Sequence, residues 1–168
     1  MFLFKPKKPE EEKKPEVSQA NIDLEIITNM NQEFALSLEL KETLNTALKV
    51  IINRINAQAA NIFLINDQKK KFECIASINQ DYLDEYELDL TDGVMAKAVE
   101  QKKCIRVGNV RKDVREIAEF YFDLDNKTNF TTYSVLCSPL IAANECIGVI
   151  HCLNKKNDDK LFIEEDRK

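Results

Sequence analysis

The chain has 168 residues, of which 44% are hydrophobic and 32% charged, and its formal net charge at pH 7 is −5. This length suits one domain with an additional segment, and the apolar content is sufficient for a core. The negative charge argues against a nucleic-acid partner that is held by phosphate neutralisation. No apolar run approaches the ~20 residues of a transmembrane helix, and the apolar start Met-Phe-Leu-Phe is too short for a signal peptide.

The five cysteines occur in apolar, strand-like contexts and include no Cys-x-x-Cys pair, which argues against a structural zinc site. Cys146 and Cys152 lie on one predicted strand, too far apart for a disulfide. We therefore expect buried free thiols, a cytoplasmic location and no metal ligands. The cysteines are Cys74, Cys104, Cys137, Cys146 and Cys152.

The N-terminal part divides into a polar leader and two helical patterns. Residues 1–16 hold three of the four prolines and runs of lysine and glutamate, so we expect a disordered charged leader. Apolar residues at three- and four-residue steps predict a helix over 17–36. Its apolar side either pairs with a second copy, which makes a homodimer, or folds back on its own domain. A second apolar stripe from Leu40 to Ile55 predicts a separate helix that packs on a sheet, with Ser37 as a candidate N-cap.

Residues 37–168 are expected to form one α+β domain. Alternating and apolar runs predict strands over 61–66, 72–78, 104–107, 133–141 and 146–153. Helices are predicted over 93–101 and 114–122, and 123–132 is predicted to be a loop. Because hairpins outnumber crossovers, we expect a central antiparallel sheet with helices on both faces. The acidic stretch 81–92 lacks the spacing and the glycine of a calcium loop, which favours a solvated loop with a short strand.

Gly93 begins one of the predicted helices. A glycine there lets a ligand or a neighbouring backbone approach the free amide groups of the first turn. Those amides and the helix dipole favour an anion such as a phosphate. An ordinary helix cap explains the same residue without a ligand.

Several segments together resemble a known family. The segments TDGVMAKAVEQKKCIRVGNV, YSVLCSPL and CIGVIHCLNKK, with a helix running into NIFLIN, resemble the GAF domain, the small-molecule sensor module of phosphodiesterases, adenylyl cyclases and many bacterial signalling proteins. The resemblance extends from about Asn29 to Asp166. It implies a GAF-like fold, a small-molecule ligand and an output domain in the full-length protein. It also implies that this chain stops where the family's C-terminal helix begins.

A narrower resemblance is to the cyclic-nucleotide-binding branch of that family. The stretch DNKTNFTT, from Asp125 to Thr132, and the stretch from Asn154 to Asp166 resemble the two signatures of the branch. The resemblance implies that cAMP or cGMP is a candidate ligand and that no other cofactor is required. The ligand-binding residues that it implies are Asn61, Gly93, Val94, Met95, Asp125, Thr128, Thr132 and His151. The resemblance also implies a structural lock that is closed by an ion pair between Lys155 and Asp166. The residues of this lock are Asn154, Lys155, Phe162 and Asp166.

The sequence departs from the branch at several positions. Asn129 stands where glycine is usual, although asparagine tolerates a left-handed backbone. Arg167 replaces a terminal glutamate, and Ala76 with Ser77 replaces an aromatic–acid pair against the purine. His151 stands where a carboxylate or an amide often contacts the base. Two interpretations of His151 remain open: a buried, hydrogen-bonded histidine without a ligand role, or a pocket residue that makes binding sensitive to pH.

Three functions follow from these patterns. The first is a regulatory sensor that binds a cyclic nucleotide or another small ligand and passes the signal to an output domain through rearrangement of helices or of a dimer. The second is a ligand-free module for dimerisation or interaction, favoured if large side chains fill the space between Thr128, His151 and the Gly93 helix. The third is an enzyme, because one GAF branch reduces free methionine sulfoxide. Since that branch's cysteine loops are absent, we expect a domain without catalytic residues.

Overall fold

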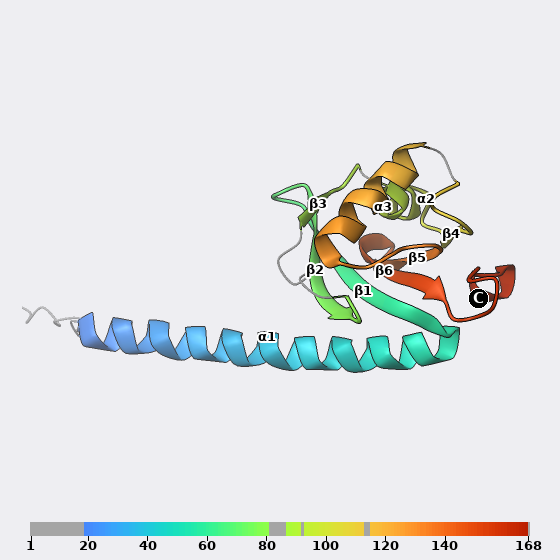
Figure 1. The fold of residues 1–168 in the computed structure, drawn as a ribbon. Coiled ribbons are helices and arrows are strands. Elements are labelled where there is room, and N and C mark those ends of the chain that lie inside the picture. The colour runs from blue at the N-terminus through green and yellow to red at the C-terminus, as the bar shows by residue number, and fades with distance from the viewer. Residues whose placement is uncertain (1–18, 81–86, 92, 113–114, 168) are drawn as a thin grey trace, which may run out of the picture. The chain divides into compact units, whose positions relative to one another are not determined.

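A six-stranded sheet forms the centre of the fold. The computed structural model describes residues 19–80, 87–91, 93–112 and 115–167. Within them the strand order is β3-β2-β1-β6-β5-β4, and each neighbouring pair is antiparallel (Figure 1). The strands are β1 (Ala57–Asn66), β2 (Lys71–Ile78), β3 (Glu87–Asp89), β4 (Ile105–Val107), β5 (Val135–Ala142) and β6 (Glu145–Lys155).

The predicted α+β class and antiparallel sheet are confirmed, and the five predicted strands are all present. The final hairpin lies inside the sheet, because β6 pairs with both β1 and β5. The short strand expected in the acidic stretch is β3, while residues 81–86 and 92 of that stretch lie outside the described residues.

Helices cover both faces of the sheet. Helices α2 (Gly93–Gln101) and α3 (Arg115–Thr128) lie over one face (Figure 1), and their buried side chains join a large apolar cluster with the strands. On the other face, the second half of α1 (Gln19–Ile55) contributes Leu48 and Ile52 to a second apolar cluster. Side chains of β1 and β6 belong to both clusters, because successive side chains of a strand point to opposite faces of the sheet.

The prediction of two separate N-terminal helices is wrong, since α1 continues through Ser37. The sequence around Ser37, Leu-Ser-Leu-Glu-Leu, contains no glycine or proline, and leucine and glutamate favour a helix. The chain divides into two units, Met1–Leu38 and Glu39–Lys168. The predicted leader, residues 1–16, lies outside the described residues.

The predicted loop over 123–132 is also partly wrong, because α3 continues to Thr128. Leu124 is 1% exposed, so it extends the buried face of the helix by another turn. The helix then ends in a Schellman-type cap: Asn129 has a left-handed backbone (φ 48°), and the Phe130 N–H donates to the Asp125 carbonyl at 3.2 Å. Asp125 and Thr128 therefore project from a helix, which fixes their directions more firmly than a loop does.

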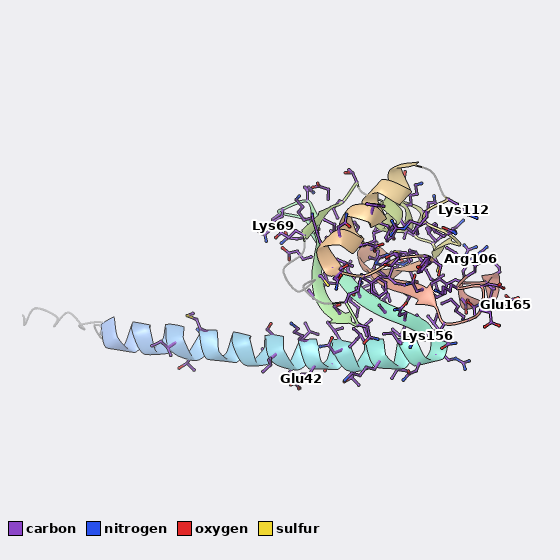
Figure 2. All side chains as sticks on the ribbon, in the orientation of Figure 1. Glu42, Lys69, Arg106, Lys112, Lys156 and Glu165 are labelled. Carbon is purple, nitrogen blue, oxygen red and sulfur yellow. The ribbon has the colours of Figure 1, made fainter. Side chains whose placement is uncertain are left out.

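Charged side chains lie on the outside of the domain, as Figure 2 shows for Lys69, Arg106 and Lys112. Among the described residues, no helix combines the length and the apolar character needed to cross a bilayer. The buried polar side chains are the exceptions to this pattern, and several of them gather on the sheet face that carries α2 and α3.

Candidate functional site

A row of polar side chains crosses four adjacent strands on the face covered by α2 and α3. The antiparallel register places Ser77 of β2 opposite Asn61 of β1, Asn61 opposite His151 of β6, and His151 opposite Cys137 of β5. Asn61, His151 and Cys137 are each 0% exposed. We call these four residues the polar row. It interrupts an apolar surface, which is unusual because a buried polar group is unfavourable unless it is hydrogen-bonded.

An amide network covers one end of the polar row. Asn61 Nδ2 donates to Gln80 Oε1 at 2.6 Å, and Ser77 Oγ lies 2.8 Å from Asn61 Oδ1. Gln80 Nε2 reaches Thr128 Oγ1 of α3 at 3.4 Å, and the Thr128 hydroxyl donates to the Leu124 carbonyl. The structure thus brings the predicted residues Asn61 and Thr128 into one network through Gln80, which the sequence reasoning did not identify.

His151 occupies the middle of the polar row beneath Tyr121 of α3. Its Nε2 atom lies 2.7 Å from the Tyr121 hydroxyl, and the two rings stack with centroids 5.6 Å apart. Phe63 presents an edge to the same imidazole at 6.2 Å. Burial lowers the pKa of His151 from 6.5 to about 3, so the ring is neutral at physiological pH. The Nδ1 atom makes no hydrogen bond to any residue in the described part of the chain.

Asp125 and Thr132, two of the predicted ligand residues, are hydrogen-bonded to each other. Thr132 donates to the Asp125 carboxylate from its hydroxyl at 2.6 Å and from its backbone N–H at 2.8 Å. Arg111 forms an ion pair with the same carboxylate, and its Nε donates to the Thr132 carbonyl at 3.3 Å. Burial raises the pKa of the Asp125 carboxyl, while Thr132 and Arg111 oppose that shift. This group of three, which we call the clasp, ties the end of α3 to the segment that enters β5.

The start of α2 contributes the remaining predicted ligand residues. Gly93 has a left-handed backbone (φ 63°), which residues with a Cβ rarely adopt. Val94 and Met95 are each 0% exposed and join the apolar cluster that also contains Tyr121. Their side chains therefore serve the core, and only the backbone amides of this turn are available to an anion.

The predicted lock is present as a set of contacts at the end of β6. Lys155 Nζ lies 2.5 Å from Asp166 Oδ1 and donates to the Ile55 carbonyl at 2.6 Å, with its ammonium 5.9 Å from the centre of the Phe162 ring. Asn154 is 2% exposed and bonds four groups: the Tyr133 and Ser134 N–H groups, the Thr131 carbonyl and the Gln58 side chain. These residues join three distant parts of the chain and support the fold.

Two hollows lie near these groups. One, of about 260 Å³, opens beside the clasp and is lined by Arg111, Phe122, Asp125, Asn126, Asn129, Phe130 and Thr131. The other, of about 210 Å³, lies on the opposite face of the sheet and includes Cys104 and Cys152. Neither is lined by Asn61 or His151, which are each 0% exposed: Gln80 bonds the Asn61 amide, and Tyr121 stacks on His151.

Sequence reasoning missed Tyr121, Gln80 and Arg111. Tyr121 lies on the apolar face of its helix, and a hydroxyl on that face is the available signal. Gln80 and Arg111 carry no local signal, because their partners lie 19 and 14 residues away in the sequence.

Comparison with known proteins agrees with this architecture. The chain is 24% identical over 123 residues to a probable 3',5'-cyclic phosphodiesterase, pde-5, from Caenorhabditis elegans, an alignment that covers 67% of this chain and 16% of that protein. The chain therefore spans a small part of that relative's length.

Solved structures share the fold at low sequence identity. The GAF domain of a phosphoenolpyruvate-protein phosphotransferase from Coxiella burnetii matches with a TM-score of 0.62 and 16% identity, over 89% of this chain and 86% of that one. A type II free methionine-R-sulfoxide reductase from Thermoplasma acidophilum matches with a TM-score of 0.58 and 18% identity, over 78% and 84%. The family model described as GAF domain matches residues 37–168, and the chain belongs to the GAF domain family.

Proposed function

We propose that this GAF domain is the regulatory sensor of a signalling protein and that its ligand is a cyclic nucleotide, cAMP or cGMP. The observation that carries the proposal is the polar row: three hydrogen-bonding side chains and the Cys137 thiol, aligned across the strands of an otherwise apolar face. A packed core does not need such a row, whereas a heterocyclic base needs donors and acceptors at the floor of an apolar site. The similarity to a probable cyclic phosphodiesterase supports the same class of ligand.

Each part of the site has a role in this proposal. The base lies over Asn61 and His151, where an amide and an imidazole offer both donors and acceptors to its edge. The phosphate meets the backbone amides at the start of α2, where the helix dipole favours negative charge. The clasp of Asp125, Thr132 and Arg111 closes the site at the end of α3.

Ligand entry requires α3 to move, because Tyr121 lies against His151 and is 0% exposed. The apparent affinity is then the intrinsic affinity reduced by the fraction of molecules in which α3 is displaced. Binding shifts that population and passes the change to an output domain.

Isothermal titration calorimetry with cAMP and cGMP tests the proposal. We expect heat of binding for the 168-residue chain, and at least about a tenfold loss of affinity for Asn61→Ala, because the base loses a buried hydrogen-bonding partner. Asn66→Ala is the matched control: it changes the same residue type at the end of the same strand, outside the polar row, and should leave the affinity unchanged.

Thermal unfolding of both variants shows whether the domain remains folded. A folded wild-type chain that gives no heat at high micromolar cAMP or cGMP rules out the nucleotide proposal. Equal losses of affinity in Asn61→Ala and Asn66→Ala would show that the base does not bind over the polar row.

A regulatory role is favoured over catalysis by the state of the thiols. Burial raises the pKa of the Cys104 and Cys137 thiols and raises that of Cys152 to about 12. Reductase chemistry of cysteine depends on accessible thiolates. These three thiols are therefore neutral at physiological pH, and we propose that the domain acts by binding.

A second candidate function is a ligand-free module for dimerisation or interaction. It is supported by Tyr121, whose buried ring stacks on His151 and fills the space above the imidazole, and by exposed apolar side chains on α1. Ile27, Met30 and Leu38 are 55%, 49% and 63% exposed. At ~100° per residue they share one side of the helix, whereas Leu36 lies on the opposite side. We propose that this side pairs with the same helix of a second copy. Sedimentation equilibrium should show a dimer that Ile27→Glu with Leu38→Glu converts to monomer and that Leu36→Glu leaves intact. A monomeric wild-type chain at high micromolar concentration contradicts this.

A further inference from the structure

The contact between Tyr121 and His151 joins α3 to the middle of the sheet. The phenol oxygen and the imidazole Nε2 are 2.7 Å apart, the rings stack, and both side chains are 0% exposed. We propose that Tyr121 is a latch whose release is coupled to protonation of His151, so that acidification displaces α3 and uncovers the polar row. As a regulator of ligand access the latch rests on the proposed function, while the opening itself does not.

The surroundings of His151 hold a neutral ring and oppose a charged one. α3 presents Tyr121, β5 presents Cys137 across the ladder, and β1 presents Asn61 and the Phe63 edge. Tyr121 and Cys137 titrate, but burial raises the pKa of each well above its ordinary value, so both stay neutral in acid. The side chains that α2 adds to this cluster are apolar: Val94, Met95 and Ala98.

Among the side chains that the structure describes, none is an acid positioned to stabilise an imidazolium in the closed state. No carboxylate of the described residues forms a hydrogen bond or an ion pair with the His151 ring. Burial is the one cause that lowers the pKa of His151. Asp125, also on α3, is occupied by Thr132 and Arg111. Protonation places a hydrogen on both ring nitrogens, and the Nδ1 N–H then has no acceptor among the described residues while the ring is buried. A proton therefore favours the arrangement in which water reaches the ring.

The sign and size of the effect follow from linkage. With the latch closed the pKa of His151 is about 3, and with the ring in water it returns to 6.5. The contribution of neutral His151 to the stability of the closed state is fully present above pH 6.5 and is lost as the pH falls from 6.5 toward 3. Between pH 7 and pH 5 the open-to-closed ratio should rise about 25-fold. Asp125 acts in the opposite direction, because a carboxyl whose pKa is raised by burial gains a proton more readily in the closed state.

The single histidine makes the test direct, because every imidazole signal in the 168-residue chain comes from His151. NMR of the ring follows its protonation, and hydrogen exchange of the α3 amides, corrected for intrinsic rates, follows opening. Without ligand we expect an apparent pKa of His151 between 3 and 6.5, and α3 exchange that is faster at pH 5 than at pH 7 by up to about 25-fold, since Asp125 opposes the His151 effect. Tyr121→Phe should raise the apparent pKa and increase opening at every pH, because the ring loses its partner while the shape is kept.

Two further variants separate the latch from general acid loosening. His151→Asn removes the group whose protonation favours opening and should abolish the acid-induced increase in α3 exchange, whereas Asp125→Asn should keep the His151 dependence. Circular dichroism at pH 7 checks that both are folded; if His151→Asn is not, the wild-type chain and Tyr121→Phe still decide the result. Exchange of α3 that does not become faster in acid in the wild type, or an acid-induced increase that persists in folded His151→Asn, overturns the latch. Because no ligand is present, neither result depends on whether cyclic nucleotides bind.

Discussion

Replacing Tyr121 by alanine is expected to lower the free energy of unfolding by about 3–5 kcal/mol, the range for truncating a large buried aromatic side chain. The ring is 0% exposed, packs in the cluster with Val94 and Met95, and stacks on His151. Its removal leaves a cavity and takes away the hydroxyl that partners His151 Nε2. Urea unfolding followed by circular dichroism measures the loss.

Tyr133→Ala is the matched control for this experiment. Tyr133 is 39% exposed, and its ring contacts Lys160 at the surface, 4.5 Å from the ammonium to the ring centre. We expect a loss below about 1 kcal/mol there, because little packed area is removed. Similar losses for the two tyrosines would show that the Tyr121 ring is not part of the core.

The same substitution bears on the proposed ligand site. The Tyr121 ring fills the space that a base would occupy above His151. Removing it lowers the free energy needed to displace α3, so at a temperature where Tyr121→Ala is folded its affinity for the ligand should increase. A decrease in affinity would show that Tyr121 helps to form the bound state instead of blocking it.

Asn154→Ala is expected to cost about 3–5 kcal/mol of stability, although the side chain it removes is small. Asn154 accepts from the Tyr133 and Ser134 N–H groups at 2.7 and 3.2 Å, and donates to the Thr131 carbonyl at 2.7 Å. Each lost hydrogen bond is worth about 1 kcal/mol, and unpaired backbone groups raise the total. The left-handed backbone of residue 154 (φ 55°) adds about 1 kcal/mol of strain for alanine.

Two further substitutions resolve these contributions. Asn154→Gly removes the same hydrogen bonds but tolerates the left-handed backbone, so it should be less destabilising than Asn154→Ala by about 1 kcal/mol. Asn157→Ala, at an exposed asparagine whose side chain bonds only Leu161 among the described residues, should cost less than about 1 kcal/mol. If denaturant unfolding gives equal values for Asn154→Ala and Asn157→Ala, Asn154 does not hold the strands together.

Most of the secondary structure was predictable because its signals are local. Alternation located β1, β2, β5 and β6, and Gly93 correctly located the start of α2. The two errors arose at helix ends. The helix through Ser37 continues because nothing in the surrounding sequence stops it, and α3 runs on to Thr128 because Leu124 is buried by contacts that are distant in sequence.

The sequence by itself determined the fold class and the family, because strand alternation and residue patterns are properties of neighbouring residues. Only the tertiary structure decided that Ser77, Asn61, His151 and Cys137 line up, since that depends on the register between strands. It also placed Tyr121 over His151, where a helix residue 30 positions away fills the space above the row. That packing makes the site closed in this structure and makes access to it depend on the movement of α3.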